Sequence, residues 1–319
     1  MQYTPIKRKI PAASISPGVY ADRDELMRLR FKASGFSFLP RQPIHSVLSG
    51  RHASRLRGRG LNFEELRSYL RGDDPRHIDW KVTARTGKPH VRVYTEEKDR
   101  TVWLLVDQRI TMFFGSRRRM KSVVAAEAAA VAAWRVLSQG DRVGALVFDD
   151  HDIQVIEPLR SEQRVAQILD CIIEKNHALN ARSGIEPNPM MFNRVLRQAC
   201  ELVRHDSLVS VVSDGAGINS ETRRYVTRLT AHNDVLFAFI YDPLEQALPD
   251  AGRLTFTDGQ TQVELNTAER KLREAYRADF EQRIRRMGDT SRRHSIPLLA
   301  VHTAAPVLDQ VRGQLGIAV

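Results

Sequence analysis

The chain has 319 residues, of which 42% are hydrophobic and 27% are charged. This is a globular composition that can bury a substantial core. Lysine and arginine outnumber aspartate and glutamate by 49 to 38, which gives a net charge of +11. That surplus suits nucleic acid, an anionic membrane surface or an acidic protein partner, and it does not choose among them.

Membrane and secretion signals are missing from the sequence. No apolar run approaches the roughly 20 residues of a membrane-spanning helix, and the basic N-terminus lacks the apolar segment of a signal peptide. Cys171 and Cys200 lie in helical patterns and have no zinc-ligand spacing. We therefore expect two buried thiols in a soluble, cytoplasmic protein.

The first hundred residues predict an N-terminal extension. Residues 21–33 have helical spacing, and prolines and glycines interrupt the pattern after them. Residues 51–60, RHASRLRGRG, form a basic loop that either meets an anion or stays solvated. We place residues 1–100 in an extension of irregular and β structure, and residues 101–319 in a separate domain.

From Thr101 onward, short apolar strands alternate with amphipathic helices, which is typical of an α/β fold: a mostly parallel sheet with helices on both faces. The expected elements are a strand at 101–107, an Ala-rich helix at 117–140, strands at 141–150 and 151–159 joined by an acidic turn, helices at 162–176 and 190–203, a strand at 207–217, a helix at 221–231, a strand at 234–242, a hairpin at 253–266, a charged helix at 267–287 capped by Thr267, a strand at 296–303 and a helix at 306–316.

Two aspartates, Asp107 and Asp214, end apolar strands of this pattern. Ligands of open parallel sheets bind at the carboxyl ends of strands. The two carboxylates and the hydroxyl of Thr111 could therefore converge on a hard cation such as Mg²⁺. The alternative is that each aspartate caps the helix that follows it.

The strand TVWLLVD, the Ala-rich helix and the segments GDRVGALVF and SLVSVVSDG together resemble the von Willebrand factor A domain. The resemblance implies a metal-ion-dependent adhesion site with a DxSxS motif, which here reads Asp107, Gln108, Arg109, Ile110, Thr111. Thr111 keeps the hydroxyl, but Arg109 brings a cation to the metal's place, and the loop threonine is replaced at best by Asn188. We infer a degenerate site in which Arg109 pairs with Asp107 or Asp214.

A second set of residues lies upstream of the first strand. It comprises Gly58, Gly60, Phe63, Arg67, Tyr69, Gly72, Asp73, Asp74, Arg76, Ile78, Asp79, Trp80, Ala84, Arg85, Val91, Arg92 and Glu97. In this order they closely resemble the signature of a bacterial family called domain of unknown function 58, and the resemblance continues to about Tyr241. It implies a soluble or membrane-tethered module that is encoded beside MoxR-type AAA+ ATPases and helps to assemble or mature other proteins. No enzymatic activity is established for that family.

The arginines and aspartates of this signature suit a network of bidentate ion pairs, and Trp80 offers a face on which an arginine can stack. Such a clamp would hold an irregular segment to the α/β domain. Its residues are Arg67, Tyr69, Gly72, Asp73, Asp74, Arg76, Asp79, Trp80, Arg85 and Arg92. A partner-binding surface built from the same residues is the second interpretation.

Catalysis is the third interpretation of the signature. Asp73, Asp74, Asp79 and Lys81 include the D-x-K of Mg²⁺-dependent nucleases, and the positive charge makes DNA an imaginable substrate. Asp79 lies only five positions after Asp74, however, and Pro75 forces a turn between them.

We find no P-loop and no G-x-S-x-G motif. The leading hypothesis is therefore a non-enzymatic adaptor that works with a MoxR-type ATPase on protein clients and has no cofactor, unless the degenerate site holds Mg²⁺. The alternative is a nucleic-acid-binding protein or nuclease. The charged helix at 267–287 predicts a solvated face with i,i+4 ion pairs.

Overall fold

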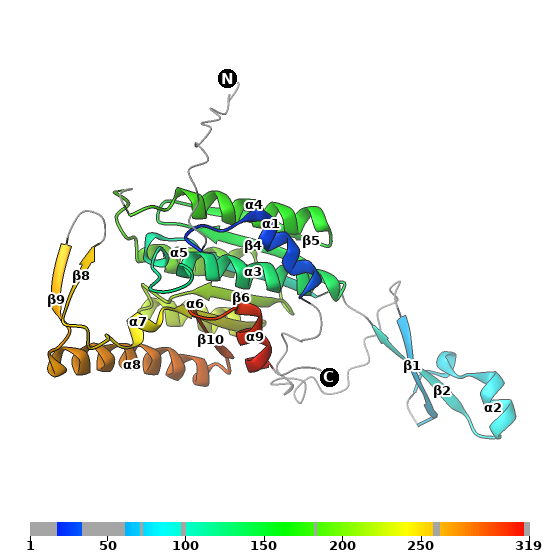
Figure 1. Ribbon diagram of the computed structural model, residues 1–319. Coiled ribbons are helices and arrows are strands. Elements are labelled where there is room, and N and C mark those ends of the chain that lie inside the picture. The colour runs from blue at the N-terminus through cyan, green and yellow to red at the C-terminus, as the bar shows by residue number, and fades with distance from the viewer. Residues whose placement is uncertain are drawn as a thin grey trace. The chain divides into compact units, whose positions relative to one another are not determined.

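The structure, a computed structural model, describes residues 18–33, 61–70, 73–96, 100–181, 184–257 and 262–315. They fall into two units, a smaller one within residues 43–99 and a larger one that contains the remainder (Figure 1). Residues 18–33, which we had assigned to the N-terminal extension, belong to the larger unit. The basic loop at 51–60 lies outside the described residues.

The larger unit is built on a six-stranded sheet in the order β10-β7-β6-β3-β4-β5. The strands are β3 (Thr101–Asp107), β4 (Arg142–Phe148), β5 (Ile153–Leu159), β6 (Leu208–Ser213), β7 (Asp234–Tyr241) and β10 (Leu298–His302). All neighbours are parallel except β4 and β5, because the short acidic turn between these two strands reverses the chain as in a hairpin. The predicted α/β fold with a mostly parallel sheet is confirmed.

Helices cover both faces of this sheet (Figure 1). On β3, Val102, Leu104 and Val106 face one apolar core, and Trp103 and Leu105 face the other, as the two-residue period of a strand requires. The first core is covered by α1 (Arg23–Arg28), α3 (Lys121–Ser138), α4 (Glu162–Ala178) and α9 (Val307–Leu315), and the second by α5 (Met190–Leu202) and α6 (Ser220–Thr230).

Helix α3 is buried along most of its length. Its alanines let the helix lie close to the sheet, which explains why the sequence is apolar on more than one side. The helix begins at Lys121, four residues later than we expected, and Gly140 follows its end with a φ of +87°. Lys121 itself is buried, so a charged residue opens the most apolar helix of the larger unit.

Residues 18–33 join the larger unit through specific contacts. The backbone N–H of Ala21 donates to the side chain of Asn176 over 2.8 Å, and the indole N–H of Trp134 donates to the carbonyl of Leu26 over 3.1 Å. Leu26 and Ala21 also lie in the core beneath α3 and α4. The sequence did not reveal these contacts because the partners are more than a hundred residues away.

The C-terminal third contains the expected hairpin, formed by β8 (Arg253–Thr257) and β9 (Gln262–Asn266). The long helix, α8 (Arg270–Arg293), starts later and ends later than predicted, and it packs on Phe239 through Phe280 and Met287. Thr267 does not cap it as we expected. Its hydroxyl donates to the carbonyl of Gly252 over 2.7 Å instead. No helix among the described residues is long and apolar enough to cross a membrane.

The smaller unit has a two-stranded antiparallel sheet of β1 (Leu61–Ser68) and β2 (His90–Glu96). In the sequence, β1 is followed by a short 3-10 helix, η2 (Pro75–His77), and by the helix α2 (Trp80–Thr86), before β2 begins. Gly87 ends α2 in the left-handed conformation at a φ of +70°, which glycine adopts without steric cost. The signature is thus more regular than the extension that we expected.

Candidate functional site

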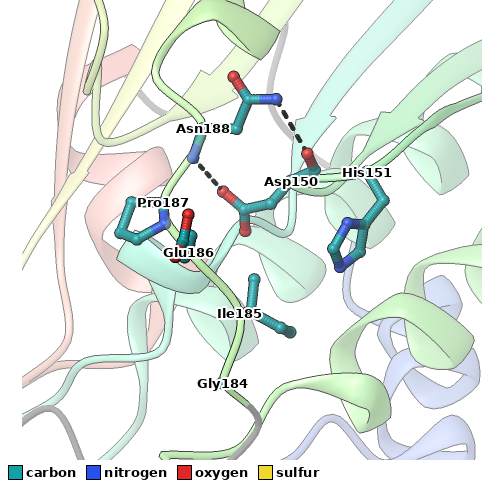
Figure 2. A pocket seen from close by; sticks show the side chains of 7 residues that line it. All are labelled: Asp150, His151, Gly184, Ile185, Glu186, Pro187 and Asn188. Carbon is teal, nitrogen blue, oxygen red and sulfur yellow. Dashed lines mark hydrogen bonds between the residues drawn. The ribbon is translucent and has the colours of Figure 1, made fainter. Parts of the chain in front are cut away.

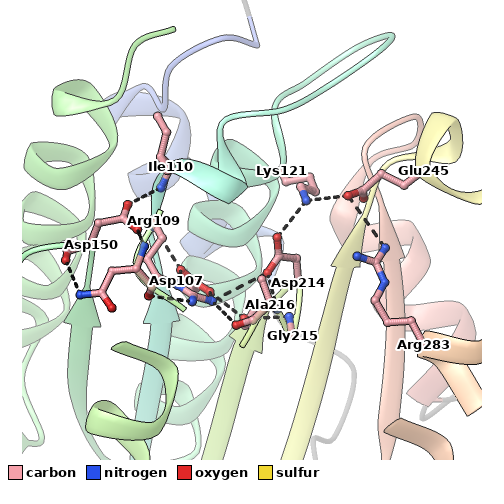
Figure 3. Close-up of polar contacts among 12 residues, drawn as sticks. Asp107, Arg109, Ile110, Lys121, Asp150, Asp214, Gly215, Ala216, Glu245 and Arg283 are labelled. Atoms are coloured by element: carbon pink, nitrogen blue, oxygen red, sulfur yellow. Dashed lines mark hydrogen bonds and ion pairs between the residues drawn. The ribbon is translucent and has the colours of Figure 1, made fainter. Parts of the chain in front are cut away.

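The parallel sheet brings Asp107 and Asp214 together. They follow the neighbouring strands β3 and β6 at the carboxyl edge of the sheet, and both are buried (Figure 3). Each accepts a hydrogen bond from the backbone N–H two residues later, Asp107 from Arg109 over 3.0 Å and Asp214 from Ala216 over 2.9 Å. The capping alternative is wrong, because Arg109 precedes the 3-10 helix Ile110–Met112 without a side-chain cap and Asn219 caps α6. Both carboxylates instead shape the turns that follow their strands.

Arg109 lies on these carboxylates (Figure 3). Its guanidinium donates to both oxygens of Asp107, over 3.0 Å from Nε and 2.6 Å from the terminal nitrogen. The same terminal nitrogen donates to the carbonyl of Ala216 over 2.9 Å and lies 3.8 Å from Asp214. The hydroxyl of Ser213 gives Asp107 a further hydrogen bond of 2.7 Å. The ion pair that we inferred between Arg109 and Asp107 is present in the structure.

Lys121 supplies a second buried cation, and the sequence analysis missed it. Its ammonium group lies 2.9 Å from Asp214 and 2.9 Å from Glu245, which belongs to the short helix α7 (Pro243–Gln246). Arg283 of α8 lies 3.9 Å from the same oxygen of Glu245. A lysine in the apolar pattern of a buried helix was the available signal, because such a residue needs a carboxylate partner.

The charges determine which groups are ionised. Burial would raise the pKa of Asp214, but Lys121 and Arg109 outweigh that effect and bring the pKa to about 2. Burial would lower the pKa of Lys121, but Asp214 and Glu245 hold it above its usual value. Asp214 therefore remains a carboxylate and Lys121 an ammonium ion at neutral pH.

A divalent cation does not fit these residues, although the fold resemblance implies one at Asp107, Thr111 and Asp214. The Thr111 hydroxyl oxygen is buried and has no hydrogen-bond partner among the described residues, as an unused ligand would. However, Arg109 takes both oxygens of Asp107, and Lys121 takes one oxygen of Asp214. A metal ion would have to displace two buried cations of the chain itself.

A cleft of about 530 Å³ opens beside this network (Figure 2). It is lined by Asp150, His151, Gly184, Ile185, Glu186, Pro187 and Asn188. Asp150 accepts hydrogen bonds from the backbone N–H groups of Ile110, over 2.6 Å, and of Asn188, over 2.8 Å. The side chain of Asn188 donates to the carbonyl of Asp150 over 3.0 Å. These bonds tie the wall of the cleft to the loop that carries Arg109.

The two cysteines offer no reactive thiol. Cys171 is buried, and burial raises its pKa to about 11. Cys200 is half-buried rather than buried, which corrects our expectation, and its pKa is also raised by burial. Thiols with raised pKa values are weak nucleophiles at neutral pH because the thiolate is the reactive form.

In the smaller unit, the signature residues make local contacts. The guanidinium of Arg67 binds both oxygens of Asp73, over 2.7 and 2.8 Å, and the N–H of Leu70 donates to the same carboxylate over 2.8 Å. Hydrogen bonding by Arg67 is the main reason that the pKa of Asp73 lies below its usual value. This pair has the bidentate geometry that the clamp hypothesis expected, but both residues lie within the smaller unit, so it does not join that unit to the α/β domain.

The other two aspartates of the signature cap helices. Asp74 accepts from the backbone N–H of Arg76 at the start of η2, over 2.9 Å. Asp79 accepts from the backbone N–H groups of Lys81 and Val82 at the start of α2, over 3.0 and 3.2 Å. The carboxylates of Asp73, Asp74 and Asp79 thus serve three separate local structures, an arrangement that does not favour the shared metal ion of a nuclease.

The remaining clamp residues are dispersed. Tyr69 donates its backbone N–H to the carbonyl of Pro89 over 2.8 Å. Arg76 and Arg85 are exposed, and Trp80 is 69% exposed. Gly72 and the side chain of Arg92 lie outside the described residues.

Helix α8 has the solvated, ion-paired face that its sequence predicted. Arg270 pairs with Glu274 over 2.6 Å, and Arg277 pairs with Glu281 over 2.9 Å, each at i,i+4 spacing. Such exposed pairs contribute only a few tenths of a kcal/mol each.

Known proteins resemble this chain over most of its length. Residues 65–287 match the family described as Protein of unknown function DUF58. The chain is 29% identical over 272 residues to an uncharacterized protein of Mycobacterium tuberculosis, and the match covers 82% of this chain and 81% of the relative. An aerotolerance-related membrane protein from Bacteroides fragilis is 13% identical, with 68% and 96% coverage and a TM-score of 0.41. The VWA domain of SpRpn10 is 11% identical, with 70% and 100% coverage and a TM-score of 0.36.

Proposed function

Because the chain belongs to the family Protein of unknown function DUF58, we propose that it is a non-enzymatic adaptor or assembly factor that acts with a MoxR-type AAA+ ATPase on protein clients in the cytoplasm. The ATPase would supply the work of nucleotide hydrolysis. This chain would supply binding surfaces that bring client and ATPase together.

The observation that carries this proposal is the ion-pair network at the carboxyl edge of the sheet. Asp107, Asp214, Arg109 and Lys121 are all buried and all paired. A general acid or base must exchange a proton near neutral pH and reach a substrate. Asp214, with a pKa of about 2, and Lys121, with a raised pKa, do not meet the first condition. Burial raises the pKa of Asp107, but this residue is fully buried and Arg109 binds both of its oxygens, so it does not meet the second condition. The network is better suited to holding loops in place.

Rigid loops at this edge favour recognition. The network joins the loops after β3 and β6 to the starts of α3 and α7, and removing any one charge would leave its partner buried without compensation. A face that does not reorganise on binding spends less free energy on ordering. The cleft beside Asp150 and Glu186 is the hollow of this face, and we assign it to one protein partner.

The test uses the purified full chain and a purified MoxR-type ATPase, with the ATPase immobilised and ATP present. We expect saturable binding and a change in the ATPase rate. Glu186→Lys in the cleft should weaken capture of one partner, client or ATPase, by about tenfold. Glu157→Lys, an equally exposed charge reversal on β5, is the matched control and should not. The absence of ATPase binding by the folded chain would contradict the proposal.

A further inference from the structure

Helix α2 presents one face to solvent that the proposed function has not used. With 3.6 residues per turn, Trp80, Lys81, Ala84 and Arg85 share one side of this helix, and all four are exposed. We call this set the tryptophan face. Trp80, Ala84 and Arg85 belong to the family signature, and the whole face lies within the smaller unit.

The opposite side of α2 fixes which way the helix is turned. The hydroxyl of Thr83 accepts the backbone N–H of His90 over 3.1 Å, and the hydroxyl of Thr86 lies 3.2 Å from the Nδ1 atom of His90. The N–H of Asp79 donates to the carbonyl of His90 over 2.8 Å. These contacts hold α2 against β2, so the tryptophan face points away from the small sheet.

Trp80 is unusual among the tryptophans of this chain. Trp103 and Trp134 are 3% and 2% exposed, whereas Trp80 is 69% exposed. An indole carries a large apolar surface that gains free energy on burial. Among the described residues, Trp80 has no part in starting or ending α2, because Asp79 caps the helix and Gly87 ends it. A tryptophan in this position is typical of a contact residue at an interface, where tryptophan is enriched among the energetically dominant positions.

Exposed cations lie beside Trp80. Lys81 and Arg85 lie on the same face, and Arg76 is exposed just before it. Of the neighbouring carboxylates, Asp79 is buried and binds the N–H groups at the start of α2, and Asp74 is exposed and binds the N–H of Arg76. The outward surface is therefore apolar at Trp80 and cationic around it.

We propose that the tryptophan face docks an acidic segment of a partner protein, with an apolar side chain of that segment against Trp80 and its carboxylates on Lys81 and Arg85. This inference rests on the proposed function, because an adaptor needs a second surface in addition to the cleft. A seven-residue helix is only about 10 Å long. It offers too short a cationic track for the several phosphate contacts by which basic proteins hold nucleic acid, but it is long enough for one side chain and its flanking carboxylates.

The experiment uses Trp80 as its own probe in the full chain. Acrylamide should quench the fluorescence of Trp80 and spare Trp103 and Trp134, because only Trp80 is exposed. The Trp80→Phe variant removes that quenchable signal and provides the baseline. A synthetic peptide with one leucine flanked by glutamates should protect Trp80 from quenching in a saturable way, and a peptide with lysines in place of the glutamates should not.

Variants assign the effect to the face. Lys81→Glu with Arg85→Glu should weaken peptide binding at least about tenfold, as should Trp80→Ala when binding is followed through a label on the peptide. The matched control is Arg223→Glu with Arg224→Glu, the same change of charge at two exposed arginines of α6. It should leave binding within about twofold, because these two arginines belong to the larger unit and are not part of the tryptophan face. All these variants change exposed side chains, and circular dichroism checks that each one folds.

Three outcomes would overturn the inference. The first is that Trp80 is already shielded from acrylamide in the free chain, which would make the face an internal contact. The second is that an oligothymidylate protects Trp80 at least as well as the peptide, which would make the face a nucleic-acid surface. The third is that the control variant loses as much affinity as the double variant at Lys81 and Arg85. Loss of ATPase binding with intact peptide protection would instead remove the proposed function and leave the docking face standing.

Discussion

The carboxyl edge of the large sheet and the outer face of α2 use the same kinds of charged residue in opposite ways. At the sheet edge, Arg109 and Lys121 are 1% and 2% exposed at the side chain and each binds a carboxylate. On α2, Lys81 and Arg85 are exposed, and the aspartates bind backbone N–H groups instead. The comparison teaches that burial decides the use of a charge: a buried cation must be neutralised within the chain, whereas an exposed one remains available to a partner.

The largest expected effect follows from removing Arg109, which tests whether a buried cation must neutralise its carboxylate. Arg109→Met leaves Asp107 buried without its cation, so we expect a loss of about 3–5 kcal/mol in the free energy of unfolding. Urea denaturation measures it. If the loss in the double variant Asp107→Asn with Arg109→Met equals the sum of the losses in the two single variants, the two residues are not coupled, and our description of the pair is wrong.

Removing Lys121 tests the other half of the network through pH. The folded pKa of Asp214, about 2, lies below its usual value of 3.8. Its contribution to stability is therefore fully present above pH 4 and is lost as the pH falls from about 4 towards 2. Lys121→Met should raise that pKa, so the acid unfolding midpoint should move to higher pH. An unchanged midpoint, measured by circular dichroism, would show that Lys121 does not hold the carboxylate in its ionised form.

A smaller effect should follow from the loss of a cap in the smaller unit. Asp79→Ala removes the acceptor for two N–H groups at the start of α2, which typically costs about 1 kcal/mol. Amide hydrogen exchange should accelerate in α2 and remain unchanged in α3 of the larger unit. The comparison is Asp74→Ala, because Asp74 caps only a three-residue helix. This variant should affect α2 less. Equal acceleration in both variants would argue against a specific cap at Asp79.

The last prediction concerns metal ions, for which we expect no binding. Isothermal titration of Mg²⁺ or Mn²⁺ into the chelator-treated chain should give no saturable heat, because Arg109 and Lys121 already neutralise Asp107 and Asp214. Arg109→Ser restores a hydroxyl and removes the guanidinium, so it is the variant in which weak binding is expected. Saturable binding by the unmodified chain that disappears in both Asp107→Ala and Asp214→Ala would show that a metal ion displaces the internal cations.

Much of the fold could be predicted because its signals are local. The alternation of apolar strands and amphipathic helices after Thr101 predicts a mostly parallel sheet. The predicted cap at Thr267 failed for a tertiary reason, since its hydroxyl bonds to Gly252, 15 residues away. The contacts of residues 18–33 with α3 and α4 were likewise invisible to a local pattern.

The candidate site divides in the same way. The sequence by itself determined that Arg109 would meet Asp107, because a spacing of two residues at a strand end keeps a long guanidinium side chain within reach of the carboxylate. Only the tertiary structure decided that Lys121 would bind Asp214 and Glu245. These partners are 93 and 124 residues from Lys121 along the chain. They meet because the parallel strand order places the ends of β3, β6 and β7 at one edge, a pairing between distant segments that no local sequence pattern specifies.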